Sequence, residues 1–433
     1  MANQLLLDID PLLKSRDFRL LFAGQLVSMF GSQLTMVAIP YQVYALTRSS
    51  LQVGAVSLAQ LVPLIVGALV GGSIGDTFER RHILLVSLSA LSLTSAALAF
   101  NASFAHPSVL AVYLISAAGA ALGGVVSTAC QAAVPSLVED GQLVAAYAAM
   151  QVVDQVAMVA GPALSGLLIG TVRVPWVYGI DAVTFVVMGL AMVRMGATSR
   201  PMGVERPKRA SVIEGLRYLR GRPVMQGAYL IDLNATVFGV PRALFPALAA
   251  TVFHGGPSTL GLLYAAPGAG ALLGAFTTGW LARIRRQAWA VIVAVGVWGT
   301  AIAIFGLVHA LWAALALLAI AGWADVISAV LRTTILQTAV SEAFRARVSS
   351  VQIAVVEGGP RLGDLEAGGV GTAVSTEFAV VSGGLACIAG AVLLAGVLPA
   401  FRRYHRPNQA EALPATSPAS GCPPQSGDAG PGP

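Results

Sequence analysis

Residues 51–75 read LQVGAVSLAQLVPLIVGALVGGSIG, a run without a single charged side chain. A helix of about 20 apolar residues is long enough to cross the roughly 30 Å hydrocarbon core of a bilayer. Eleven similar runs lie before and after this one, separated by short turns. The sequence therefore predicts an all-α polytopic membrane protein with twelve transmembrane helices, at residues 20–46, 51–75, 82–101, 108–133, 143–170, 173–195, 223–253, 258–282, 288–308, 310–338, 348–372 and 376–400.

The composition of the whole chain agrees with this class. Of its 433 residues, 56% are hydrophobic and only 11% are charged, and the mean hydropathy is +0.77. The net charge of +6 fits attraction to anionic lipid at the inner face of a membrane. No soluble basic domain is present, so we expect membrane lipid as a partner and no nucleic acid.

The distribution of Lys and Arg predicts the orientation. Placing the N-terminus in the cytoplasm puts 21 of these residues on the inner side and only Arg48 and Arg173 on the outer side. Residues 1–18 hold an apolar patch that acidic residues and a proline interrupt, which predicts a short amphipathic helix rather than a cleavable signal peptide. We expect a multi-pass protein of the cell (inner or plasma) membrane with both termini in the cytoplasm.

The chain divides into two halves. We expect a six-helix bundle at 1–195, a cytoplasmic linker with an amphipathic helix at 196–222, a second six-helix bundle at 223–401 and a disordered tail at 402–433. Three glycines of the second span recur in the eighth span with the same displacement of 207 residues: Gly54, Gly67 and Gly72 return as Gly261, Gly274 and Gly279. Such parallel repeats are typical of secondary transporters, which expose a site at the bilayer midplane alternately to either side.

The loop after the second span runs from Gly72 through Asp76 to Arg80 and Arg81 and resembles the G-x-x-x-D-x-x-x-R-R signature of the major facilitator superfamily. The resemblance implies that this gating motif latches the outward-open state, with Arg80 and Arg81 bonded to carbonyls or acids across the interface between the halves. The copy after the eighth span is degenerate, because Arg283 stands where the acid would be. A simpler interpretation is that the two arginines only set the topology.

A second resemblance lies in the fifth span, where Gly161, Pro162 and Gly166 are similar to the antiporter motif of exporters in this superfamily. Proline bends a helix and glycine lets a neighbouring helix approach closely. Strings along most of the chain resemble the enterobactin exporter branch and related multidrug-like efflux proteins, among them FRLLFAGQLVS, GDTFERRHILL, EGLRYLRGRPV and GLLYAAPGAGALLGAFTTG. They indicate the branch better than the transported molecule.

Ionisable residues at bilayer depth are costly and are therefore functional candidates. A proton-coupled exporter needs a carboxyl group that gains and loses a proton near the working pH. Asp154 and Asp325 are the first candidates, because neither has an Arg within one helical turn in sequence, and Glu357 competes with them. The alternative is a structural ion pair, such as Asp232 with Arg242 or Glu357 with Arg361.

In the superfamily, the first, fourth, seventh and tenth spans line the central cavity. That resemblance implies cargo contacts for Gln33, Tyr41, Gln131, Asn234, Arg242, Trp323 and Arg332, with Asp325 beside them. Tyr41 has the alternative of an interfacial aromatic, and Trp323 that of a packing residue.

We expect no enzyme activity, cofactor or metal. The sequence has no Walker loop, no catalytic triad at one depth and no cluster of histidines. Its three cysteines have no metal-ligand spacing. The predicted function is export of a small organic molecule, a siderophore or an amphipathic drug, by a monomer that exchanges it for protons with alternating access. Two alternatives are an importer or facilitator with the same fold and a membrane sensor or scaffold that transports nothing.

Overall fold

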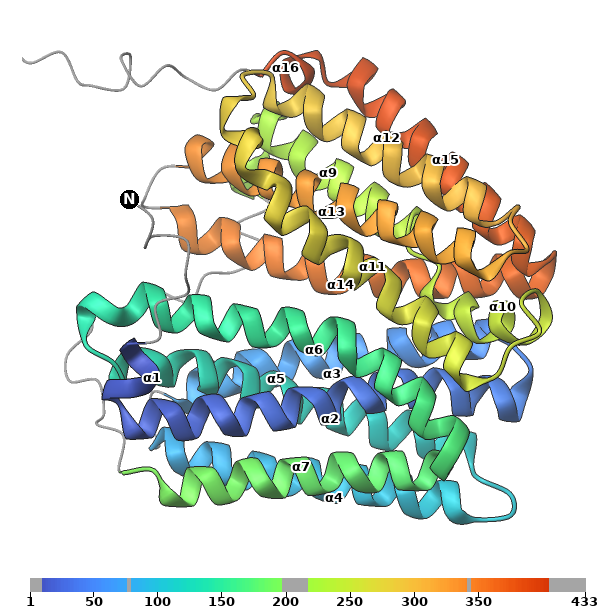
Figure 1. The fold of residues 1–433 in the computed structure, drawn as a ribbon. Coiled ribbons are helices and arrows are strands. Elements are labelled where there is room, and N and C mark those ends of the chain that lie inside the picture. The colour runs from blue at the N-terminus through green and yellow to red at the C-terminus, as the bar shows by residue number, and fades with distance from the viewer. Residues whose placement is uncertain (1–9, 76–78, 197–216, 341–343, 405–433) are drawn as a thin grey trace, which may run out of the picture.

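The computed structural model describes residues 10–75, 79–196, 217–340 and 344–404 of the chain (Figure 1). The tail after residue 404 and Asp76 of the gating motif lie outside these residues, as does most of the predicted linker helix, of which residues 217–219 are described and helical. In the described part the regular elements are helices: α1 (Asp10–Lys14), α2 (Arg16–Thr47), α3 (Ser50–Gly75), α4 (Arg80–Ser103), α5 (Val109–Ala133), α6 (Leu143–Val172), α7 (Val174–Arg194), α9 (Pro223–Phe238), α10 (Phe245–Thr251), α11 (Pro257–Thr277), α12 (Gln287–Phe305), α13 (Leu311–Ala339), α14 (Arg345–Ala373), α15 (Thr376–Val397) and α16 (Pro399–Arg402), with short 3₁₀ turns between some of them.

Eleven spans among the described residues are long and apolar enough to cross a membrane. The predicted eleventh span, which forms α14, is not among them. With 29 residues α14 has the length to cross, but it carries Glu357, Arg361, Asp364 and Glu366. The all-α membrane fold is confirmed, and the four charged residues of α14 need partners inside the protein.

The predicted seventh span, residues 223–253, is not one continuous helix. Helix α9 ends at Phe238, and after Gly239 and Pro241 the chain resumes as a 3₁₀ turn at Arg242–Leu244 followed by α10. Proline lacks the backbone N–H that a helix interior requires. Glycine has no Cβ, so its backbone adopts non-helical conformations easily. The predicted span is present as Pro223–Thr251, but hydropathy alone does not register the break inside it.

Serine side chains define where several helices begin. The Ser15 hydroxyl accepts from the Phe18 amide at 3.1 Å at the start of α2, and Ser375 does the same for Phe378 at 3.1 Å at the start of α15. A side-chain oxygen at this position satisfies one of the backbone N–H groups that a helix leaves unbonded. Local sequence therefore sets these boundaries, independently of the tertiary packing.

One face of each outer helix is apolar and unpacked. Val86, Leu93 and Phe100 follow one another at intervals of seven residues along α4 and are 70%, 71% and 67% exposed. Residues seven apart lie on the same side of a helix. In a bilayer this stripe contacts lipid, whereas Leu84, Leu88 and Leu98 on the opposite side are buried in the bundle.

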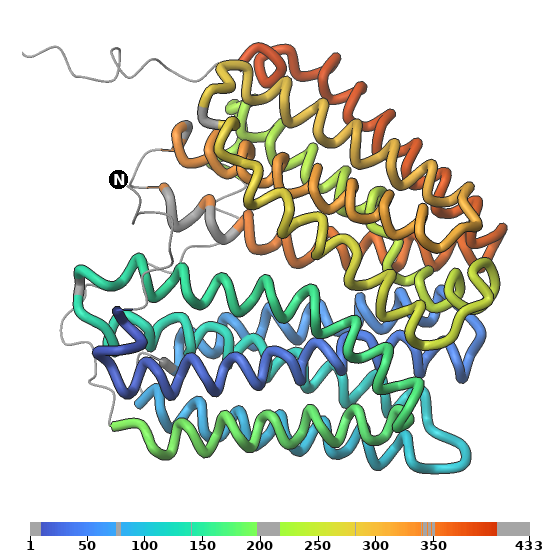
Figure 2. The backbone as a smooth tube through the Cα atoms, in the orientation of Figure 1, coloured from blue at the N-terminus to red at the C-terminus, as the bar shows by residue number. Residues whose placement is uncertain are grey.

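The two halves share one packing scheme. Helices α9, α11 and α12 begin 207 residues after α2, α3 and α4, the displacement seen in the glycines. The first half pairs α3 with α5, α4 with α7 and α2 with α6, and the second half pairs α11 with α13, α12 with α15 and α9 with α14. The backbone trace in Figure 2 shows the halves as two adjacent sets of helices, blue to green and yellow-green to red.

The contacts between the halves join α3 to α14 and α6 to α11. A Cβ at Gly54 would overlap the carbonyl of Asp364, and a Cβ at Gly261 would overlap the carbonyl of Pro162. Thr372 also accepts a hydrogen bond from the Leu51 amide at 3.0 Å. These contacts gather at the end where α3 and α11 begin and where α6 and α14 finish. In Figures 1 and 2 the halves approach each other at that end, near α10, and diverge toward the N-terminus.

Candidate functional site

Two cavities lie beside the interface between the halves. The first, of about 700 Å³, is lined by helices α2 to α7 of the first half. The second, of about 540 Å³, is lined mainly by the second half. Met36, Pro40, Ser57 and Gln60 belong to both linings, so the two cavities adjoin along α2 and α3. Together they form the concave, partly polar space that a small-molecule site requires.

The first cavity is amphipathic. Its lining includes glutamines and methionines from several helices, namely Gln25, Gln60, Gln131, Gln151, Met29, Met36, Met150 and Met188. Two of its lining residues are acids, Asp154 and Asp181, and none of the described residues that line it is a Lys, Arg or His. Flexible thioethers adapt to varied apolar shapes, while amides offer both donors and acceptors.

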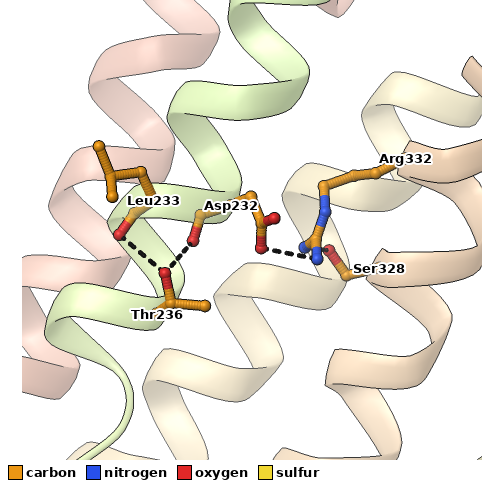
Figure 3. A network of polar contacts seen from close by, with 5 residues as sticks. All are labelled: Asp232, Leu233, Thr236, Ser328 and Arg332. Carbon is orange, nitrogen blue, oxygen red and sulfur yellow. Dashed lines mark hydrogen bonds and ion pairs between the residues drawn. The ribbon is translucent and has the colours of Figure 1, made fainter. Parts of the chain in front are cut away.

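Charges of both signs line the second cavity: Arg242, Arg332, Arg361, Asp232, Asp325, Glu357 and Asp364. The Asp232 carboxylate of α9 lies 2.7 Å from the Arg332 guanidinium of α13. Figure 3 shows this pair, with Ser328 accepting a further hydrogen bond from Arg332 at 2.6 Å. Both ionic side chains are buried, at 6% and 7% exposure. Such a partner offsets the cost of burying a charge.

The pairing differs from the alternative weighed from the sequence. Asp232 was matched with Arg242, ten residues further along, but its ion pair is with Arg332. The chain break at Gly239 places Arg242 beyond the end of α9, near enough to Asp364 and Asp325 to interact electrostatically with both. Asp325 also interacts electrostatically with Arg332 and Asp232. It is therefore part of a charge cluster, not the isolated acid that its local sequence indicates.

Side chains from three other helices satisfy the backbone at the break. The Trp298 indole of α12 donates to the Gly239 carbonyl at 2.8 Å, and the Tyr264 hydroxyl of α11 donates to the Arg242 carbonyl at 3.1 Å. The Ala243 amide donates to the Asp364 carboxylate of α14 at 3.1 Å. Non-helical backbone at membrane depth persists only where protein groups or a cavity replace its lost hydrogen bonds.

Helix α14 contributes a second ion pair. The Arg361 guanidinium lies 2.8 Å from the Glu357 carboxylate and also donates to the Glu357 carbonyl at 2.7 Å. The local pair weighed from the sequence is therefore present. Asp364, one turn further on, is buried at 7% exposure.

Asp154 of α6 lines the first cavity and is half-buried. Its Oδ1 atom is buried and has no hydrogen-bond partner among the described residues. The same holds for Oδ1 of Asp181 on α7, a residue that our reading of the sequence did not single out. It stands in an apolar run, VYGIDAVTFVV, so the criterion of an ionisable residue at bilayer depth would have found it.

The arginines of the gating motif bind carbonyls within their own half. Arg80 donates to the Ala132 carbonyl at the end of α5 at 2.6 Å, and Arg81 donates to the Val193 carbonyl at the end of α7 at 2.6 Å. The contacts predicted across the halves belong to an outward-open state and stay a prediction. Cations are stabilised at the carbonyl end of a helix. A Cβ at Gly72 would meet no atom within 4 Å.

The three antiporter-motif residues lie on α6 between its neighbours. A Cβ at Gly161 would press on Gln33 of α2, and one at Gly166 would overlap Pro257 and Gly261 of α11. Pro162 lies inside the helix. The motif therefore lets α6 approach both the first half and the second.

The cargo candidates divide into two groups. Gln131, Arg242 and Arg332 belong to the cavity linings. The other candidates, which are absent from both linings among the described residues, are engaged elsewhere: Gln33 against Gly161, Tyr41 against the hydrophobic core, Asn234 donating to the Cys387 carbonyl at 2.8 Å and Trp323 donating to the Thr277 hydroxyl at 3.0 Å. Expecting cavity contacts for these four was wrong in this structure, because hydropathy does not tell which face of a helix points inward.

Residues 9–417 match the model of a family described as transmembrane secretion effectors. Among curated proteins, the chain is 30% identical over 402 residues to the enterobactin exporter EntS of Citrobacter koseri, covering 93% of this chain and 96% of the relative. The enterobactin exporter EntS of Escherichia coli is also 30% identical, over 401 residues, with the same shares covered.

Solved structures show the same fold at low identity. The nucleoside transporter NupG superposes with a TM-score of 0.71 at 12% identity, covering 90% of this chain and 100% of that one. A bacterial homologue of the iron transporter ferroportin, in an inward-facing state, gives 0.66 at 16% identity, covering 90% and 99%. From the family match, the shared fold and the two pseudo-symmetric halves, this chain belongs to the transmembrane secretion effectors of the major facilitator superfamily, in the branch of the enterobactin exporters.

Proposed function

We propose that the protein exports a small organic molecule across the cell membrane in exchange for protons. The observation that carries the proposal is the pair of adjoining cavities beside the interface of two similar halves, with an Asp154 carboxyl that has no partner for its Oδ1 among the described residues facing one of them. Burying an ionised acid without a cation costs free energy, so a carboxyl in this position is a candidate for binding a proton during transport. The likeness to proteins named as enterobactin exporters supports the outward direction.

Alternating access follows from where the halves touch. With the N-terminus in the cytoplasm, the contacts at Gly54 and Gly261 lie at the outer end, so the cavities are reached from the inside. Cargo enters from the cytoplasm, and the halves then rock about the cavities until the glycine contacts part and the inner ends meet. Close glycine packing supports this step, because such contacts separate without disentangling long side chains.

Three carboxyls are candidates for the proton site. Glu357 forms an ion pair with Arg361, and Asp325 interacts with Arg332 and Arg242. The arginines stabilise the ionised form of both acids, which therefore have less need of a proton. Asp154 lines a cavity without a cation among the described lining residues, so its ionised form lacks a partner until a proton or a cationic group arrives. We therefore place the coupling at Asp154 before Asp325 and Glu357.

The cargo is an amphipathic molecule with hydrogen-bonding groups, of the siderophore or drug class. In the first cavity, the glutamine amides can hydrogen-bond the polar groups of such a molecule, and the methionine thioethers can contact its apolar part. Arg242 and Arg332 of the second cavity supply donors for acidic groups. The gating motif, to which Asp76 belongs, acts as the inner latch, with Arg80 and Arg81 holding the start of α4 against the ends of α5 and α7.

The experiment compares metabolites secreted by a deletion strain with those of the same strain carrying the wild-type gene or an Asp154→Asn gene, under iron limitation. We expect one compound to accumulate inside the deletion and Asp154→Asn cells and to return to the medium with the wild type. Loss of uptake in the deletion strain would instead identify an importer. Unchanged metabolites in all strains, in iron-limited and drug-treated cultures, would favour a non-transporting sensor.

A further inference from the structure

A second carboxyl of the first cavity is set in surroundings unlike those of the paired acids. Asp181 lies in the first half of α7, and only 1% of the residue is exposed. It nevertheless belongs to the cavity lining. We propose that Asp181 is a proton-binding residue of the transport cycle, an assignment that rests on the proton exchange proposed above.

Hydroxyl groups from two other helices hold the carboxylate. Thr35 of α2 donates to Oδ2 at 2.6 Å, and Ser95 of α4 donates to the same oxygen at 2.8 Å. The second oxygen, Oδ1, is buried and has no hydrogen-bond partner among the described residues. One oxygen of this carboxyl is therefore hydrogen-bonded to two hydroxyls, and the other has no partner that would hold the group in its ionised form.

The two hydroxyls suit a group that changes its protonation state. Ser and Thr each have one donor hydrogen and two acceptor lone pairs, and the hydrogen rotates to suit the partner. They donate to Asp181 when it is ionised, and one of them accepts when it is protonated. An arginine has no acceptor, so the pairs Asp232–Arg332 and Glu357–Arg361 hold only the ionised form of their acids.

The space around Oδ1 excludes larger cations. A Cβ at Gly31 of α2 would press against Oδ1 and overlap Thr184, so the glycine leaves just the room that the oxygen needs. Almost no part of the side chain is exposed, so an organic cation in the cavity does not reach it. A proton reaches the carboxyl at Oδ2 through the hydroxyls of Thr35 and Ser95, which line the same cavity.

Among the described residues of the helices packed against α7, no Lys, Arg or His lines the cavity that holds this carboxyl. Asp154 and Tyr147 of α6 line the same cavity, and Tyr178, one turn before Asp181, donates to Gln42 of α2 at 2.8 Å. The charged and phenolic groups of α2 and α4 lie nearer the ends of those helices: Arg16, Asp17, Arg19, Tyr41, Tyr44, Arg80, Arg81 and His82. The ionised Asp181 is therefore stabilised by hydroxyls alone, and a proton is the partner that neutralises it.

The test is infrared difference spectroscopy on the purified full chain in detergent, stepping the pH with no cargo present. A protonated carboxylic acid has a carbonyl stretch that its ionised form lacks and that shifts in heavy water. We expect a pH-dependent band in the wild type that Asp181→Asn abolishes. The control is Ser92→Ala, which removes a hydrogen bond of 2.9 Å from α4 to the Ala182 carbonyl, beside Asp181, without touching the carboxyl; it should keep the band.

The asparagine keeps the size of the side chain and an oxygen for Thr35 and Ser95, so the variant should fold, and its unfolding temperature checks this. A folded Asp181→Asn protein with an unchanged band would overturn the assignment, as would a wild type without any band. Failure of the proposed function looks different. Wild-type transport that ignores the pH gradient would contradict proton exchange, while the band and its loss in Asp181→Asn would remain.

Discussion

The Asp232 carboxylate and the Arg332 guanidinium, 100 residues apart in the chain, meet at 2.7 Å and join α9 to α13. The pair stands beside the break that separates α9 from α10 and borders the second cavity. It therefore links the first and fourth helices of the second half at the depth where cargo would bind. Any rearrangement of that half must keep this pair or replace it.

Removing one partner of this pair should lower the free energy of unfolding more than removing both charges. Arg332→Ala leaves Asp232 buried without a cation, and we expect a loss of about 3–5 kcal/mol in the free energy of unfolding. Asp232→Asn combined with Arg332→Gln removes both charges of the pair, while Arg242 stays beside Asp325, and it should regain most of this free energy. Thermal unfolding in detergent compares the two, and equal losses would mean that the ion pair is not the cause.

Asp154→Asn should abolish export driven by a pH gradient and leave expression intact, because the variant removes the proton but keeps the size of the side chain. Efflux from vesicles with and without an imposed gradient measures the effect. Gln155→Ala is the control, since the neighbouring residue is absent from the described lining of both cavities. Full gradient-driven export by Asp154→Asn would remove this residue from the mechanism.

Gly54→Ala should shift the protein away from the form in which the outer ends meet. The added Cβ overlaps the Asp364 carbonyl, so α3 and α14 cannot keep their distance. Spin labels at Phe104→Cys and Leu307→Cys, in a chain without its native cysteines, should report a longer distance between the halves. Gly189→Ala, where a Cβ meets nothing within 4 Å, should leave the distance unchanged; a shift in both variants would point to a general helix effect.

Trp298→Phe should weaken the break in the seventh span. The variant keeps an aromatic ring but leaves the Gly239 carbonyl without its donor. An unsatisfied buried carbonyl costs about 1–3 kcal/mol, which should appear as a lower unfolding temperature. Trp289→Phe on the same helix changes a residue that is 48% exposed, and it should have little effect. Similar losses for both would show that the indole bond is unimportant.

The sequence predicted the membrane fold well because spanning helices depend on a property that each residue carries by itself. Apolar runs of sufficient length mark the helices, and the offset between Gly54 and Gly261 matches the offset between the helices of the two halves. The same reasoning failed at Gly239, where the chain breaks inside an apolar run. There the deciding groups, Trp298 and Tyr264, come from other helices.

The candidate site was predicted in part. Ionisable residues in apolar runs were recognised as unusual, and Asp154, Arg242 and Arg332 do line cavities. Their partners were not predictable, since Asp232 binds Arg332 in preference to the nearer Arg242. Asn234 and Trp323 turn to neighbouring helices instead. A helix places its residues on faces, but only its neighbours decide which face is lined by a cavity.

From the amino-acid sequence alone it follows that the protein lies in a lipid bilayer, how many long helices it has and that its second half repeats the first. These features depend on hydropathy and residue spacing, which are local quantities. Only the tertiary structure decided which carboxyls form ion pairs and which do not. It also placed the hydroxyls of Thr35 and Ser95 within hydrogen-bond distance of Asp181. Hydrogen bonds and ion pairs act over a few ångströms in space, whatever the separation along the chain.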